Sequence, residues 1–168
     1  MSALKRRDIR IKVMQVLYAQ LLSGDSIEKV KKDLLSDIPE KENREFANVL
    51  IKSILDNEKL IDDYILEKVK NWEMERISLL DKIIMKIGLA ELLYFPDIPP
   101  KVSINEAIDI AKEYCTKNSG RFVNGILDAI HDDLKKDKLL NKSGRGLVNS
   151  KKKNNHNNLH PENNNNSA

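Results

Sequence analysis

Apolar residues recur every three to four positions through most of this chain, in stripes separated by polar residues. The first clear stripe consists of Ile9, Val13, Val16, Leu17 and Leu21. This spacing is that of an amphipathic α-helix, because one turn takes 3.6 residues and brings such positions to one face. Further stripes follow up to Leu134, and no stretch alternates apolar and polar residues as a half-buried strand does. The pattern predicts an all-α fold of six or seven helices.

Glycine, proline and capping residues mark the expected helix ends. Gly24 follows the first stripe, where helices often end in a left-handed residue. Asp25 with Glu28 favours the start of a second helix, and the prolines within residues 96–100 separate two later helices. Gly125 interrupts the last stripe, so we expect another helix backbone to approach it closely. Further start signals are Ser78 with Asp81, Ser103 with Glu106 as a capping box, and Asn118–Ser119.

The C-terminal part of the chain has a different composition from the rest. Residues 141–168 contain ten asparagines and no aromatic residue. Such a segment buries too little apolar surface to offset the entropy lost on ordering. We therefore expect a helical domain over residues 1–140 and a disordered Asn/Lys-rich tail over residues 141–168.

The charge of the chain is unevenly distributed. The formal net charge is +3, from 29 Lys and Arg against 26 Asp and Glu. Residues 1–12 and residues 141–168 each hold five basic residues and one acidic residue. The body between them is therefore acidic. Basic ends favour nucleic acid as a partner, and an acidic body suits a basic protein partner.

Several function classes are excluded or disfavoured. No apolar run approaches the ~20 residues of a membrane span, and no N-terminal signal segment is visible. A single cysteine, Cys115, leaves no disulfide framework and no multi-cysteine metal site. Glycine-rich phosphate loops and nucleophile–base arrangements are also missing from the sequence. We expect a cytoplasmic protein that is not an enzyme and has no metal or cofactor.

The first helix carries the first candidate RNA surface. Arg6, Arg7 and Arg10 are predicted to project away from the apolar stripe, with Gln15 at the flank and Tyr18 two turns further on. Guanidinium groups bind phosphate in a planar, forked geometry, and an aromatic ring can stack on a base. The alternative is an ordinary amphipathic helix whose arginines are only solvated and whose tyrosine borders the core.

A second candidate RNA surface lies at the start of the last helix. Lys117, Asn118, Ser119 and Arg121 surround a helix N-terminus, which favours anions, and Phe122 follows them. Basic and amide groups beside an aromatic ring suit single-stranded RNA. The alternative is an ordinary N-cap followed by a core phenylalanine.

Three segments of the chain resemble the bacterial transcription antitermination factors of the NusB family. They are residues 6–18 (RRDIRIKVMQVLY), 97–107 (DIPPKVSINEA) and 119–128 (SGRFVNGILD). The resemblance covers about residues 4–134. It implies two small helical bundles packed at an angle and binding of single-stranded boxA RNA. It also implies a heterodimer with the ribosomal protein NusE, which joins the RNA polymerase antitermination complex.

The same resemblance implies the functional residues. The RNA surface would consist of Arg6, Arg7, Arg10, Gln15, Tyr18, Lys117, Asn118, Ser119, Arg121 and Phe122. The partner surface would include Asp81, Pro99, Lys101 and Glu106. Family members commonly have an acid where this chain has Asn118, so we expect equal or tighter RNA binding here. The competing hypothesis is a helical protein–protein interaction module with only non-specific affinity for RNA.

Overall fold

The computed structural model describes residues 2–72 and 77–148. These residues form seven α-helices and one 3₁₀ helix, without a strand, which confirms the all-α prediction. The α-helices are α1 (Arg6–Ser23), α2 (Ile27–Leu35), α3 (Lys41–Asp56), α4 (Glu58–Val69), α5 (Leu79–Tyr94), α6 (Pro100–Tyr114) and α7 (Ser119–Lys136). The 3₁₀ helix η1 spans Gly144–Leu147. None of the described helices is long and apolar enough to cross a membrane.

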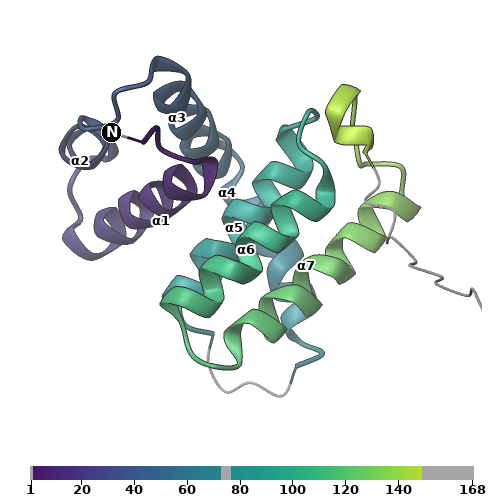
Figure 1. The fold of residues 1–168 in the computed structure, drawn as a ribbon. Helices are drawn as coiled ribbons and strands as arrows, with labels where there is room; N and C mark the ends of the chain where they lie inside the picture. Colours follow the sequence, from purple (N-terminus) through teal and green to yellow (C-terminus); the bar gives the residue numbers. More distant parts are fainter. Residues whose placement is uncertain (1, 73–76, 149–168) are drawn as a thin grey trace, which may run out of the picture.

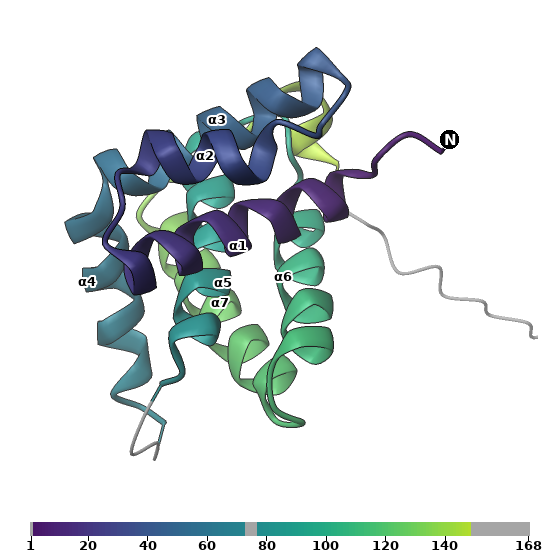
Figure 2. The same cartoon turned by 90° about the vertical axis from the view of Figure 1, so that its left-hand side faces the viewer.

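The helices form two bundles, as expected. Helices α1, α2 and α3 pack together, and α4 to α7 form a second group (Figure 1). Helix α5 joins the two groups because it packs against α1 and α3 as well as against α6 and α7. Figure 2 shows α1 lying across α5 and α6.

Helix α5 is buried on almost all sides. Every residue from 83 to 92 is buried, including the charged Lys86 and Glu91. A helix that is apolar all round belongs in the interior of a fold. The two charged residues are exceptions that need partners: Glu91 pairs with Arg10 of α1, and Lys86 Nζ lies 3.2 Å from Asp62 Oδ1 of α4.

Several predicted helix ends are confirmed. Gly24 has φ +69°, the left-handed conformation predicted after the first stripe. The Ser78 hydroxyl accepts a hydrogen bond from the Asp81 N–H at 3.0 Å and caps α5. The second helix begins after Ser26 and not at Asp25, because the Ser26 hydroxyl accepts from the Lys29 N–H.

The predicted capping box of Ser103 and Glu106 is wrong. Helix α6 begins three residues earlier at Pro100, because proline fits the first helical position, where its missing N–H has no partner to lose. Ser103 therefore lies inside the helix, buried, and its hydroxyl donates to Glu91 Oε1 at 3.1 Å.

The segment after α7 is partly packed on the body. Lys142 and Ser143 hydrogen-bond to backbone carbonyls at the end of α5. Residues 141–148, which we assigned to the disordered tail, are thus ordered against the helical domain. The rest of that tail, including His156 and His160, lies outside the described residues.

Candidate nucleic-acid interface

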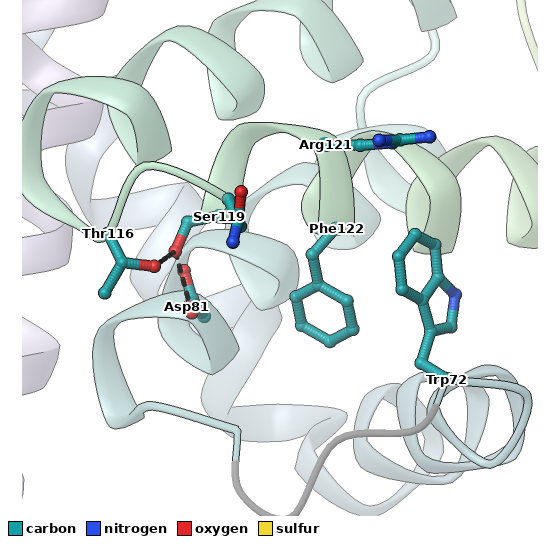
Figure 3. A pocket seen from close by; sticks show the side chains of 7 residues that line it. Trp72, Asp81, Thr116, Ser119, Arg121 and Phe122 are labelled. Atoms are coloured by element: carbon teal, nitrogen blue, oxygen red, sulfur yellow. Dashed lines mark hydrogen bonds between the residues drawn. The ribbon is translucent and has the colours of Figure 1, made fainter.

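A cavity of about 430 Å³ opens at the start of α7 (Figure 3). Its lining comes from three places: the segment after α4, the first turn of α5, and the α6–α7 connection with the first turn of α7. The lining residues are Trp72, Asp81, Thr116, Asn118, Ser119, Arg121 and Phe122. Four of the ten predicted RNA residues therefore meet at one place.

Two aromatic rings form one side of the cavity. Phe122 packs edge-to-face against Trp72, with ring centroids 5.3 Å apart. Phe122 is only 3 % exposed, so the expectation of an open stacking platform at this residue is wrong: its helix turns the ring towards the core. Trp72 is the half-buried aromatic residue of the site, and our sequence analysis missed it.

Gly125 is the sequence signal that points to Trp72. A Cβ atom at Gly125 would lie 2.3 Å from Trp72 Cζ2. The group that approaches this glycine is therefore an indole ring and not the helix backbone that we predicted. Glycine is required here because the ring occupies the space of its missing side chain.

Asp81 forms the polar side of the cavity. Its carboxylate is 4 % exposed, and Oδ2 accepts a hydrogen bond from the Ser119 hydroxyl at 3.1 Å. The other oxygen, Oδ1, is buried and has no hydrogen-bond partner among the residues that the structure describes. Asp81 was predicted on the partner surface and Ser119 as an exposed RNA contact. Both are buried, because the first turns of α5 and α7 pack against each other here.

Exposed polar side chains surround the cavity mouth. Lys117, Asn118 and Arg121 are exposed and form no ion pair or side-chain hydrogen bond with another described residue. Asn118 holds the N-cap position of α7, but its side chain does not cap the helix. Its amide therefore remains available to a ligand, together with two cations.

A second hollow of about 330 Å³ adjoins this cavity and shares Thr116 with it. It brings Tyr18 of α1 together with Tyr114 at the end of α6. Cys115 also lines it, and burial, followed by the nearby Asp81 carboxylate, raises the pKa of its thiol to about 12. The thiol is therefore uncharged at neutral pH and does not repel an anion. Gln15 is exposed one turn earlier on α1.

The arginines at the start of α1 are largely engaged by carboxylates. Arg10 is 4 % exposed and donates to Glu91 from Nε at 2.8 Å and from Nη2 at 2.6 Å. The prediction that Arg10 is exposed is wrong. Arg10 lies three residues before Val13 and four residues before Met14, both of which are buried. This spacing places Arg10 at the edge of the buried face of α1.

Arg7 and Arg6 remain closer to the surface. Arg7 donates to Glu106 at 2.8 Å and to Asp109 at 2.7 Å, which joins α1 to α6 and raises its pKa. Glu106, predicted on the partner surface, is thus held by an ion pair within the molecule. Arg6 lies over the Phe46 ring, 4.2 Å from its centroid, and its side chain is 41 % exposed.

Comparison with known proteins identifies the chain. Residues 7–132 match the model of the NusB family. The transcription antitermination protein NusB of Chloroherpeton thalassium is 47 % identical over 150 residues, which cover 86 % of this chain and 70 % of the relative. The NusB protein of Salinibacter ruber is 42 % identical over 146 residues, which cover 85 % of this chain and 91 % of the relative. The chain belongs to the NusB family.

Solved NusB structures share this fold. The structure of T. maritima NusB has a TM-score of 0.71 and 36 % identity, and it covers 79 % of this chain and 94 % of its own. A structure of the antitermination factors NusB and NusE in complex with dsRNA has a TM-score of 0.67 and 26 % identity. The match covers 76 % of this chain and 96 % of the matched chain. As a member of the NusB family, the chain is a transcription antitermination factor.

The residues that we assigned by resemblance to NusB fall into two groups. Tyr18 and the start of α7 border adjoining hollows. Arg6, Arg7 and Arg10 lie instead at the N-terminal end of α1, where they face α3, α5 and α6. Two of the expected partner residues lie at the start of α6. Pro99 occupies the N-cap position, and Lys101 is exposed in the first turn of this helix.

Proposed function

We propose that this chain is a non-catalytic, cytoplasmic RNA-binding adaptor. It binds the single-stranded boxA element of nascent ribosomal RNA together with the ribosomal protein NusE, and it joins the RNA polymerase antitermination complex. The proposal rests mainly on one observation: a cavity that combines aromatic rings, a buried carboxylate oxygen without a donor, and exposed cations.

The chemistry of the cavity fits an unstacked nucleobase. A base has an apolar face for contact with Trp72, whose ring Phe122 supports edge-to-face, and an edge of N–H donors that can donate to Asp81 Oδ1. A buried acceptor without a partner costs about 1–3 kcal/mol, which a ligand N–H recovers. Lys117 and Arg121 at the mouth can neutralise the phosphates on either side of that base.

The adjoining hollow extends this surface for a neighbouring nucleotide. Tyr18 and Tyr114 offer aromatic edges there, and no charged carboxylate lines it. The two hollows share Thr116, so a strand that occupies one can continue into the other. The position of Tyr18 beside this hollow supports the RNA contact that we propose for it.

The buried arginines have a positioning role in this proposal. Arg10 and Arg7 bind carboxylates of α5 and α6, and these contacts fix the angle at which α1 crosses the second bundle. Direct phosphate contacts come from Lys117 and Arg121, which are exposed, and from Arg6, whose side chain is 41 % exposed and contacts Glu42 only loosely.

NusE is expected to bind at the start of α6. Pro99 and Lys101 lie there at the surface, on a body whose sequence is acidic overall. Glu106 would support this surface from behind through its ion pair with Arg7. Charge complementarity favours a basic partner such as an RNA-binding ribosomal protein.

The test is a binding assay with labelled boxA RNA and scrambled RNA, with and without NusE, at several salt concentrations. Three phosphate contacts predict that log K falls with log[salt] with a slope near roughly −2, since each contact on a single strand contributes about −0.7. We expect boxA RNA to bind tighter than scrambled RNA, and NusE to increase the difference. Equal affinity for both RNAs in the presence of NusE would contradict the proposal.

The competing function is a protein interaction module without RNA specificity. The neutralisation of Arg7 and Arg10 by carboxylates favours it, because fewer cations are left for phosphate. The same assay separates the two functions. The module predicts NusE binding together with weak RNA binding that depends on salt but not on sequence.

A further inference from the structure

The segment that follows α7 is attached to the end of α5 by a lysine. Lys142 Nζ donates to the carbonyl oxygens of Glu91 at 3.0 Å and Phe95 at 2.8 Å. Each of these carbonyls also accepts a backbone N–H, Glu91 from Phe95 and Phe95 from Ile98, so the lysine adds a second hydrogen bond to each oxygen. The Ser143 N–H donates to the Pro96 carbonyl at 2.9 Å and adds a third attachment.

The short helix η1 lies tightly against the same place. Gly146 is buried, and a Cβ atom there would lie 1.9 Å from the Pro96 carbonyl oxygen. Only glycine allows the two backbones to come so close. The position of η1, and with it the position of Arg145, is therefore defined by contacts with the body.

Arg145 and Val148 complete a groove of about 530 Å³ between the two bundles. The rest of its lining comes from the start of α1, from α3 and from the α5–α6 connection, and includes Arg6, Phe46, Phe95 and Val102. Figure 1 shows η1, in yellow-green, beside the connection between α5 and α6.

Two arginines in this groove have unused donors. Arg6 Nη1 is buried and has no hydrogen-bond partner within residues 2–72 and 77–148. Arg145 is exposed, and its side chain forms no ion pair or hydrogen bond with another described residue. Two guanidinium groups along one groove present planar donor sets of the kind that phosphate oxygens accept.

Two carboxylates also line the groove, and each has a cation nearby. The charge of Asp97 stabilises the protonated form of Lys142, which raises the pKa of this lysine. Burial has the larger effect and lowers that pKa overall. Glu42 is 87 % exposed and approaches Arg6 Nη2 only at 3.6 Å. A phosphate could replace this loose, solvated contact at small cost.

We infer that this groove is a second RNA surface, which binds the phosphate backbone of nucleotides flanking the boxA element. The inference rests on the proposed function. RNA is favoured over an acidic protein segment because the sequence from Lys142 to Lys153 contains five basic residues and no acidic one, a density that suits a polyanion. The arginine-rich start of α1 borders the groove, so the RNA surface of the domain would extend along it.

The experiment compares a minimal boxA RNA with the same RNA extended by flanking nucleotides, both bound to the full chain with NusE. Arg145→Ala should weaken binding of the extended RNA by about fivefold to tenfold and leave the minimal RNA unchanged. For the extended RNA, the slope of log K against log[salt] should become shallower by about 0.7, the loss of one phosphate contact.

A second variant and a control complete the test. Lys142→Met keeps an apolar stem but removes the donors that hold the segment, so it should produce the same selective loss for the extended RNA. Lys32→Ala removes an exposed cation on α2, away from the groove, and should affect neither RNA.

The possible outcomes separate the two proposals. An equal effect of Arg145→Ala on both RNAs, or no effect on either, would overturn the flanking-RNA groove and leave the proposed function intact. Loss of NusE affinity with unchanged RNA affinity would assign the groove to a protein partner and also overturn it. If the unmodified chain shows no preference for boxA RNA, both proposals fail.

Discussion

Neighbouring arginines of α1 have different roles because their burial differs. Arg10 and Glu91 are 4 % and 0 % exposed and form two short hydrogen bonds across the boundary between the bundles. Arg7 is 42 % exposed and binds Glu106 and Asp109 at the surface. A buried charge that loses its partner is far more costly than a solvated one. At the residue scale, burial therefore decides which arginine supports the fold.

Arg10→Ala should lower the free energy of unfolding by about 3–5 kcal/mol, because among the described residues it leaves the buried Glu91 carboxylate with only the Ser103 hydroxyl as a side-chain donor. Arg7→Ala, the matched control, should cost about 1 kcal/mol or less. Urea denaturation followed by circular dichroism measures both. A loss below ~1 kcal/mol for Arg10→Ala would show that the buried pair is not needed for stability.

At the scale of elements, one side chain joins α4 to α7. Trp72 lies after α4, and its ring packs against two residues of α7. These are Phe122 and Gly125, which has no side chain to keep the ring away. The same ring borders the candidate base cavity. The packing of the two helices and the shape of the RNA surface therefore depend on the same contact.

Gly125→Ala should destabilise the protein, although alanine favours a helix interior over glycine by about 1 kcal/mol. Its Cβ would lie 2.3 Å from the indole, and such overpacking costs about 1–3 kcal/mol. Trp72 is the only tryptophan, so its fluorescence should shift to longer wavelength as the ring is displaced towards water. Asn124→Ala, at an exposed position of α7, is the control and should leave the spectrum unchanged.

At the scale of the whole molecule, α5 holds the parts together. The first bundle binds it through Arg10, the second surrounds it, and the C-terminal segment covers its last turn through Lys142. Its two ends lie in different candidate sites, with Asp81 in the base cavity and Phe95 in the groove beside η1. A change in the tilt of α5 would therefore alter both proposed RNA surfaces together.

The attachment of the C-terminal segment should depend on pH. Burial lowers the pKa of Lys142 from 10.5 to about 8, against the opposing effect of Glu91 and Asp97. Between these two values the unfolded chain binds more protons at this lysine than the folded chain does, so its contribution to stability rises as pH increases from 8 to 10.5. Below pH 8 the lysine is charged in both states, and its contribution is constant.

The measurement is the difference in unfolding free energy between the unmodified chain and Lys142→Met from pH 7 to pH 10. The comparison with the variant cancels other groups, such as Cys115, whose raised pKa acts in the opposite direction. The difference should shift in favour of the unmodified chain above pH 8. A constant difference would show that the lysine does not titrate while attached.

The sequence by itself determined the helices and the family. Helical periodicity depends only on local spacing, and the caps at Gly24 and Ser78 depend on residues within one turn, so both could be read directly. The family followed from segments such as residues 119–128, which are contiguous in the chain.

Only the tertiary structure decided which side chains face a ligand. Arg10 meets a carboxylate 81 positions away, and Trp72 meets a glycine on another helix, which no local pattern reveals. Residues 141–148 are ordered by carbonyls at the end of α5 and not by apolar residues of their own. Burial and long-range pairing depend on how elements pack, and for that reason the candidate RNA surface could be proposed in detail only after the fold was known.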